Sequence, residues 1–258
     1  MRVKRLLLLL VCLTPLTGSM SAQESGQGVS RIEQDALAAN EQGVALVKSA
    51  KYEEAVGAFD LAIKLYPRFA IAYNNLGVTY NSLGRHEDAI KVLKRALELA
   101  PAYAEAYYNL GVAYQRLGRR RDAIEAYQRA ITFKPDFAQA YDRMGIVFED
   151  KGQHKRAIQS YLEAIRIRQN YAEAYNNLGT ALVESGQYEQ AIEKFERAIK
   201  IKPGLAVAYY NIGVVSVRLK RHEVALRQYG LLTSLDSTLA VKLYNEIYDG
   251  KVLALRIR

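Results

Sequence analysis

The sequence predicts an all-α solenoid of six helix-turn-helix repeats with a capping helix at the C-terminal end. The first observation is a step of 34 residues: Ala-Tyr-Asn-Asn-Leu-Gly occurs at 72–77 and at 174–179, and close variants fill the interval. The second is a proline at the same step, at 67, 101, 135 and 203. We number the positions of each repeat as places 1 to 34, which gives the repeats 36–69, 70–103, 104–137, 138–171, 172–205 and 206–239.

Each repeat carries the pattern of two helices. Places 4, 7, 8 and 11 lie on one face of a helix with 3.6 residues per turn, and places 20, 24 and 27 lie on one face of a second helix. Place 8 is always glycine and place 20 always alanine. These small residues let the two helix axes approach closely, while tyrosine at place 4 and large residues at place 24 fill the core. Gly84, Gly118, Gly152 and Gly186 mark the turn between the helices.

This spacing of a large residue, leucine, glycine, alanine, aromatic and proline positions resembles the tetratricopeptide repeat family over residues 36–239. The resemblance implies a right-handed superhelical solenoid, in which the first helix of each repeat lines a concave groove. It also implies a scaffold that binds other proteins or peptides.

Both ends of the array carry helix signals. The segment from Ser30 to Glu33 has the capping-box pattern, so we expect the first helix to begin there and the repeat region to span 31–239. After the last repeat, Ser237 or Thr238 is expected to cap a helix over 240–250 that ends at Gly250. The remaining tail, 251–258, has no clear period.

The N-terminal segment 1–22 reads as a secretory signal peptide. It has a basic start, an apolar run from Leu6 to Leu13 and small residues at the expected cleavage region, 19–22. The run is shorter than the roughly 20 residues of a membrane-spanning helix. Cys12 suggests a lipoprotein as an alternative, but Val11 stands before it, where a lipid-attachment site requires a small residue. Residues 23–30 are predicted to be a flexible linker, and the mature protein is expected in the periplasm or outside the cell.

No enzyme, cofactor or metal site is predicted. The three histidines, His86, His154 and His222, all occupy place 17, at the start of the second helix of alternate repeats. We expect the repeats between them to hold them too far apart to share a metal ion. The glycines fall at packing and turn positions rather than in a phosphate-binding loop, and the serines have no fixed histidine partner.

The predicted site is a peptide-binding groove on the first helices. Place 6 is asparagine in four of the six repeats. A row of amides can pair with the backbone of an extended peptide, and the row resembles the asparagine ladder in the repeat arm of O-linked N-acetylglucosamine transferase, whose catalytic domain is absent here. Place 5 supplies polar and aromatic neighbours. The predicted groove residues are Asn75, Asn109, Arg143, Asn177 and Asn211 at place 6, and Asn74, Tyr108, Asp142, Asn176 and Tyr210 at place 5.

Two interpretations of this asparagine row stay open. The amides either bind a ligand or support the repeats by bonding to a neighbouring repeat or to water. If they only bind a ligand, replacing Asn75, Asn109, Asn177 and Asn211 together by alanine should lower partner capture and leave melting nearly unchanged.

The favoured function is a non-catalytic scaffold for extended peptide segments, active in envelope assembly or secretion. One alternative is an adaptor for an anionic polymer or membrane surface, bound through a basic rim at the turns between helices; export makes nucleic acid an unexpected partner. Another alternative is self-association through the terminal caps. The net charge is +9, or +6 once the leader's Arg2, Lys4 and Arg5 are removed (9 − 3). The rim residues are Lys48, Lys51, Arg85, Arg116, Arg119, Arg120, Arg121, Lys151, Lys155, Arg156, Arg218, Lys220 and Arg221.

Overall fold

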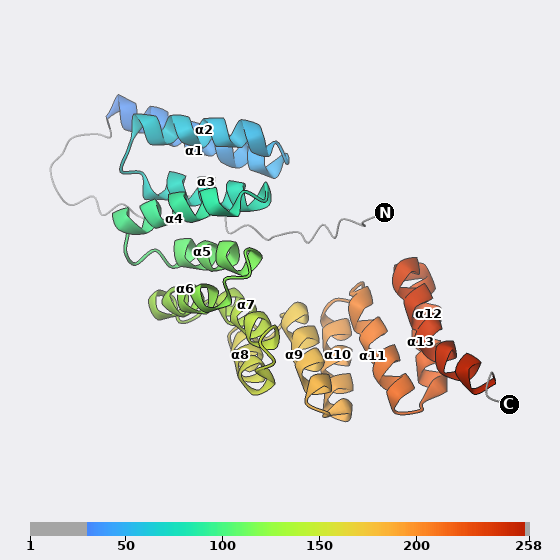
Figure 1. Cartoon of the computed structure of the whole chain (residues 1–258). Coiled ribbons are helices and arrows are strands. Elements are labelled where there is room, and N and C mark those ends of the chain that lie inside the picture. Colours follow the sequence, from blue (N-terminus) through green and yellow to red (C-terminus); the bar gives the residue numbers. More distant parts are fainter. Residues whose placement is uncertain (1–29, 256–258) are drawn as a thin grey trace. The chain divides into compact units, whose positions relative to one another are not determined.

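The structure is a computed structural model that describes residues 30–255 and the side chains of residues 30–248. The predicted leader and most of the predicted linker lie outside these residues. In the described part of the chain every regular element is an α-helix, and successive helices from α1 to α6 and from α7 to α13 are antiparallel neighbours (Figure 1). They are α1 (Arg31–Lys48), α2 (Tyr52–Leu65), α3 (Ala70–Ser82), α4 (His86–Leu99), α5 (Ala104–Arg116), α6 (Arg120–Phe133), α7 (Ala138–Glu149), α8 (His154–Ile167), α9 (Ala172–Glu184), α10 (Tyr188–Ile201), α11 (Ala206–Arg218), α12 (His222–Leu235) and α13 (Ser237–Leu255).

These helices confirm the all-α solenoid of six repeats with a capping helix. The first helices of repeats two to six all begin at place 1, and the second helices of all six repeats begin at place 17. The chain divides into two compact units, Met1–Pro135 with the helices of repeats one to three (α1 to α6) and Asp136–Arg258 with those of repeats four to six and the capping helix (α7 to α13). We describe each unit by itself. None of the described helices is sufficiently long and apolar to span a bilayer.

The packing of the two helices within a repeat follows the predicted glycine and alanine positions. All six alanines at place 20 are fully buried. A Cβ built on the glycine at place 8 would lie only 2.5–2.6 Å from the side chain at place 24 in repeats one to five. The large side chain therefore lies directly against the bare glycine backbone, and this contact sets the close approach of the helices.

The tyrosines at place 4 differ from the prediction. Tyr73, Tyr107, Tyr141, Tyr175 and Tyr209 are all partly exposed, so they are not core residues. Their rings lie at the edge of the repeat: Tyr107 stacks on Phe133 of the second helix at 5.6 Å, and the Tyr209 hydroxyl donates to the Pro203 carbonyl oxygen. A tyrosine in this position covers apolar surface while its hydroxyl stays near water.

The turn between the helices adopts the left-handed conformation in every repeat. The four predicted glycines have φ between 66° and 77°. Ala50 and Lys220, which replace glycine in the first and last repeats, have φ of 58°. The backbone geometry of the repeat therefore persists where the residue that favours it is absent, at a conformational cost of about 1 kcal/mol in each terminal repeat.

The start of the array is as predicted. Ser30 is the N-cap of α1: its hydroxyl accepts a bond from the Glu33 N–H, and the Glu33 carboxylate accepts one from the Ser30 N–H.

The end of the array differs in two ways. Asp236, rather than Ser237 or Thr238, caps α13, because its carboxylate accepts bonds from the N–H groups of Thr238 and Leu239. In addition, α13 continues through Gly250 to Leu255, so the predicted end at Gly250 is wrong. One glycine inside a helix costs only about 1 kcal/mol, which does not stop a helix whose following residues are good helix formers.

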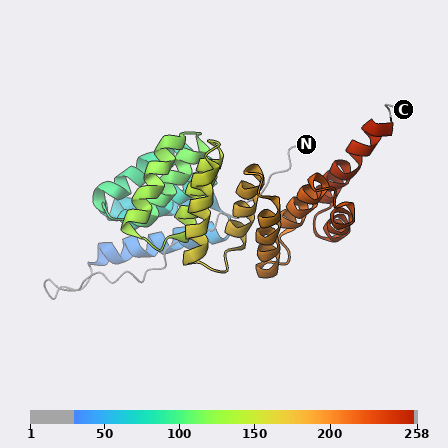
Figure 2. The same ribbon diagram turned by 90° about the horizontal axis from the view of Figure 1, so that it is seen from below.

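The capping helix also changes how repeat six packs. It lies beside α11 and α12 (Figures 1 and 2), and Leu243 takes the position against Gly213 that a place-24 side chain occupies in the other repeats. Tyr229, the place-24 residue of repeat six, is therefore displaced and partly exposed.

Candidate protein-interaction surface

The asparagines at place 6 of the first unit bond to the repeat before them. The Asn75 Nδ2 donates to Asn40 Oδ1 at 3.0 Å, and the Asn109 Nδ2 donates to Asn74 Oδ1 at 2.9 Å. In both bonds the acceptor belongs to place 5 of the preceding repeat. The amide row is therefore an inter-repeat connection in this unit.

A further bond joins these two connections. The Asn74 Nδ2 donates to Asn75 Oδ1 at 3.4 Å, so the amides run continuously from α5 through α3 to α1. Asn40, Asn74, Asn75 and Asn109 are all buried, with exposed fractions of 5 % or less. Buried amides need such partners, because an unsatisfied amide in the interior costs about 1–3 kcal/mol.

The second unit repeats the arrangement with one acidic acceptor. The Asn177 Nδ2 donates to Asp142 Oδ1 at 2.9 Å, and the Asn211 Nδ2 donates to Asn176 Oδ1 at 3.0 Å. Asp142 also accepts a longer bond from the Tyr171 hydroxyl. Burial raises the pKa of the Asp142 carboxyl above its ordinary value, while the bond from Asn177 acts in the opposite direction.

The structure thus separates the ten predicted groove residues into two groups. Six are buried: Asn74, Asn75, Tyr108, Asn109, Asp142 and Asn176. The other four are partly exposed and all belong to the second unit: Arg143, Asn177, Tyr210 and Asn211. The side of α7, α9 and α11 that carries places 5, 6 and 9, which we call the inner face, is also partly exposed at Ile146, Thr180 and Val214.

The amides of α3 are covered on several sides, because α3 contacts α1, α2 and α5 as well as its own partner α4. A pattern in the sequence predicts these hydrogen bonds between repeats. Each asparagine at place 6 follows a repeat with asparagine or aspartate at place 5, whereas Arg143 follows a repeat with Tyr108 there. This pairing at a separation of 35 residues predicts an inter-repeat bond.

The histidines lie at the starts of α4, α8 and α12, as predicted. The His86 Nδ1 lies 3.2 Å from Asn81 Oδ1, and Asn81 donates from its Nδ2 to the Asn109 carbonyl oxygen. Since Asn81 Oδ1 is an acceptor, His86 supplies the proton of this contact. Burial, helped by the positive charge of Arg116, lowers the pKa of His86. Among the described residues, no group of three or more His, Cys, Asp or Glu side chains could hold a metal ion.

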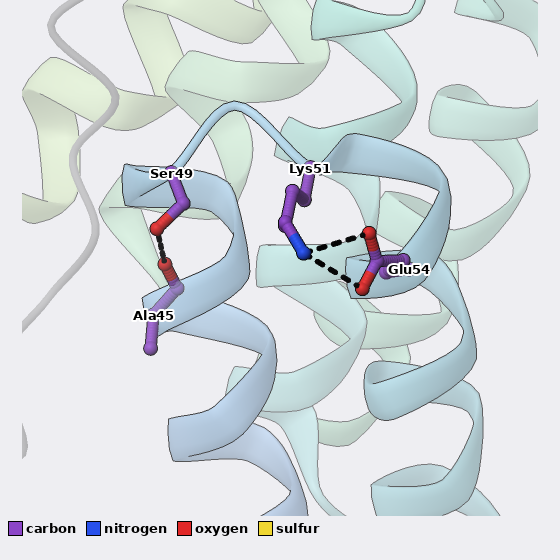
Figure 3. A network of polar contacts seen from close by, with 4 residues as sticks. All are labelled: Ala45, Ser49, Lys51 and Glu54. Carbon is purple, nitrogen blue, oxygen red and sulfur yellow. Dashed lines mark hydrogen bonds and ion pairs between the residues drawn. The ribbon is translucent and has the colours of Figure 1, made fainter.

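Several cations of the basic rim are paired with acids at the start of the second helix. Arg85 lies 3.0 Å from Asp88 and Arg119 lies 2.7 Å from Asp122, and each guanidinium also stacks on a tyrosine ring. The first repeat has an equivalent ion pair, in which lysine replaces arginine: Lys51 pairs with Glu54 (Figure 3). These pairs reduce the positive field of the rim.

The repeating pairs of short helices, packed by glycine against a large side chain and bonded between repeats, define a class of α-helical repeat scaffolds. Tetratricopeptide repeat family models match residues 68–136, 136–203 and 176–233. The chain belongs to the tetratricopeptide repeat family, whose domains bind proteins and peptides. A search of curated proteins gave no match.

Solved structures support the same assignment. The chain is 32% identical to MamA, with 62% of this chain and 94% of that chain covered and a TM-score of 0.57. It is 27% identical to YrrB, described as a repeat protein with an unusual peptide-binding site, over 73% of this chain and 98% of that chain, with a TM-score of 0.58. PilF from Pseudomonas aeruginosa, at 15% identity, 84% and 100% coverage and a TM-score of 0.74, shows the fold alone.

Proposed function

We propose that the chain is a non-catalytic scaffold that binds extended peptide segments along the inner face of repeats four to six. The observation that carries this proposal is the partial exposure of Arg143, Asn177, Tyr210 and Asn211, whereas the corresponding polar residues of repeats two and three are buried. A side chain must reach the surface to bind a partner.

The amides of Asn177 and Asn211 keep part of their bonding capacity. Each primary amide has two N–H donors and one oxygen, and the inter-repeat bond uses a single N–H. Successive first helices lie about 10 Å apart and an extended chain advances about 3.3 Å per residue. One asparagine would therefore meet about every third residue of the peptide and pair with its backbone rather than its side chains.

Two neighbours would add contact and charge. Tyr210 offers an amphipathic ring of the kind enriched in interfaces, and Arg143 offers a cation. Each neutral hydrogen bond adds only about 1 kcal/mol, so we expect micromolar binding and a transient partner. YrrB, a relative described by its peptide-binding site, supports this class of ligand.

Selection from a phage-displayed library of random 12-residue peptides tests the proposal. Peptides selected on the full chain should bind the Asn177→Ala and Asn211→Ala variants at least ten times more weakly, because the amide oxygen and the second N–H, which the inter-repeat bond does not use, are lost. Binding would be measured by biolayer interferometry well below the melting temperature of each variant.

Asn75→Ala is the matched control. It removes an inter-repeat bond of the same kind at a fully buried position, so it should lower stability and leave peptide affinity unchanged. If Asn75→Ala weakens peptide binding as much as Asn177→Ala does, the loss reports destabilisation and the inner face is not the binding site.

We also propose that this scaffold acts after export, in envelope assembly or secretion. The support is the segment 1–22, with its basic start, short apolar run and small residues, which lies outside the described part of the chain. Intact-mass measurement of the protein from its native compartment should give a chain that begins within residues 20–23. A chain that still carries Met1 to Ser19 would contradict cleavage.

A further inference from the structure

We propose that repeat four contains a pH switch, in which Asp142 and Glu149 of α7 stabilise the repeat as neutral carboxyl groups and loosen it when they ionise. Asp142 occupies place 5 and Glu149 place 12, about two helical turns apart on one side of α7. Asp142 is 4 % exposed and Glu149 is partly buried. This inference goes beyond peptide binding and does not depend on that proposal.

Both carboxyl groups act on one buried tyrosine of α8. The Tyr161 hydroxyl donates to Glu149 Oε2 at 2.7 Å, and the ring of Tyr161 is fully buried against Gly145. Burial, reinforced by the charges of Glu149 and Asp142, raises the pKa of Tyr161. The hydroxyl therefore keeps its proton and remains the donor, and Glu149 supplies only an acceptor.

Repeat three makes the bond to Glu149 with a neutral acceptor. There Gln115 stands at place 12, and its Oε1 accepts from the Tyr127 hydroxyl at 2.8 Å. Gln115 is partly buried and Tyr127 fully buried, like Glu149 and Tyr161. A protonated carboxyl group offers a carbonyl oxygen equivalent to that of glutamine. The negative charge of Glu149 is therefore not needed for the bond.

The bond to Asp142 has a neutral counterpart in repeat five. Asn176 Oδ1 accepts from the Asn211 amide at 3.0 Å, just as Asp142 Oδ1 accepts from Asn177 at 2.9 Å. Ionising a buried carboxyl group costs free energy because the charge loses its hydration. At both places, therefore, the neutral form makes the structural bond without this cost.

The charges around Glu149 come from three helices. Burial raises the pKa of the Glu149 carboxyl above its ordinary value, and the negative charges of Asp150 on α7 and Glu184 on α9 act in the same direction. The bond from Tyr161 and the proximity of His154, both on α8, act in the opposite direction. Burial is the largest of these effects, so the neutral form is favoured.

The surroundings of Asp142 lead to the same result. Burial raises the pKa of the Asp142 carboxyl, and Glu173 of α9 adds to this rise. The bonds from Asn177 and Tyr171 and the positive charge of Arg143 favour the ionised form. Burial again has the largest effect.

The direction of the pH response follows from these raised pKa values. The folded chain holds the two protons more tightly than the unfolded chain does. The stabilisation by the neutral carboxyl groups is complete below their ordinary pKa values, at about pH 4, and is lost as the pH rises through the raised values. Since proteins open in local cooperative units, repeat four should open more readily as the pH rises.

Hydrogen exchange of the full chain, followed by mass spectrometry over α7 and α8, tests the proposal. The unmodified chain is compared with the double variant Asp142→Asn and Glu149→Gln, whose amides do not titrate. After correction for the intrinsic exchange rate, the protection of the double variant relative to the unmodified chain should rise about tenfold between about pH 4.5 and about pH 8. A ratio that stays constant over this range overturns the proposal.

Asp150→Asn is the matched control, because it removes an exposed acid beside Glu149 and should change this pH response by less than about twofold. If it abolishes the response as fully as the double variant does, the general charge of the unit is the cause and the proposal is wrong.

The reverse substitution is an independent test in the other unit. Gln115→Glu places a carboxyl group beside the buried Tyr127 and should give α5 and α6 a loss of protection with rising pH that the unmodified chain lacks there. If protection of α5 and α6 in this variant does not respond to pH, a buried carboxyl group at place 12 does not act as a switch, and the proposal is overturned.

Discussion

Replacing Asn75 by alanine is expected to lower the free energy of unfolding by about 3 kcal/mol, more than a typical substitution. The change removes the bond to Asn40 and the bond from Asn74, and it leaves both of these amides buried without their partner. Two unsatisfied buried groups cost about 1–3 kcal/mol each, partly offset by relaxation. Urea denaturation followed by circular dichroism would measure the loss.

Gln128→Ala is the control, because it removes an exposed amide from α6 in the same unit and should change stability by less than about 0.5 kcal/mol. Replacing Asn40 and Asn75 together by leucine should recover only part of the loss, since Asn40 is then no longer an unpaired buried amide but Asn74 Nδ2 still lacks its acceptor. An Asn75→Ala variant as stable as the unmodified chain would show that the amide row contributes nothing to the contact between repeats.

Replacing Gly111 by alanine should lower the free energy of unfolding by about 3 kcal/mol. Here the cause is an added methyl group for which the core has no room, rather than a lost hydrogen bond. The added Cβ would lie 2.6 Å from Cε1 and 2.7 Å from Cδ1 of Tyr127. That ring is fully buried, and its hydroxyl donates to Gln115 Oε1, so it cannot turn away without breaking a bond. Overpacking of a dense core costs about 1–3 kcal/mol, and this immobile ring favours the upper value. The same urea titration would measure the change.

Gly57→Ala separates this clash from the intrinsic effect of a helical glycine. No atom lies within 4 Å of a Cβ built on Gly57, which is exposed on α2 of the same unit. Alanine is the better helix former by about 1 kcal/mol, so this variant should be more stable than the unmodified chain. Equal losses from Gly57→Ala and Gly111→Ala would show that the contact with Tyr127 does not limit the helix approach.

The two predictions concern the two contacts that build the array. Glycine against a large side chain joins the helices inside a repeat, and paired amides join one repeat to the next. Because the amides of Asn177 and Asn211 take part in this second contact, their loss should lower melting as well as peptide capture. Their role differs in this respect from a ladder that only binds a ligand.

Much of the fold was predictable because each structural position occurs in six repeats, so a residue that is ambiguous in one repeat is defined by its counterparts in the others. The start of α1 at the Ser30 capping box, the glycine turns and the helix starts at places 1 and 17 all follow from local backbone chemistry. The end of α13 did not, because a single glycine such as Gly250 weakens a helix without ending it. The N-cap of α13 was predicted one or two residues too late in the chain, because Asp236, Ser237 and Thr238 can all serve as N-cap residues.

The candidate site was less predictable. The place-6 residues were correctly assigned to the first helix of each repeat. Whether their side chains are buried depends on which neighbouring helices pack over them, and the residue pattern of a single helix does not show this. Asn75 and Asn177 occupy the same place, yet only Asn75 is fully buried. The pairing of places 5 and 6 across 35 residues was present in the sequence and became meaningful only once neighbouring helices were known to meet there.

The sequence by itself determined the number of repeats, the two helices of each repeat and the residues that let them pack, because a 34-residue period repeats the same short-range constraints six times. The tertiary structure alone decided which amides are used between repeats, which polar side chains reach the surface and how Leu243 displaces Tyr229. These depend on contacts between helices that are distant along the chain, and no local propensity encodes them.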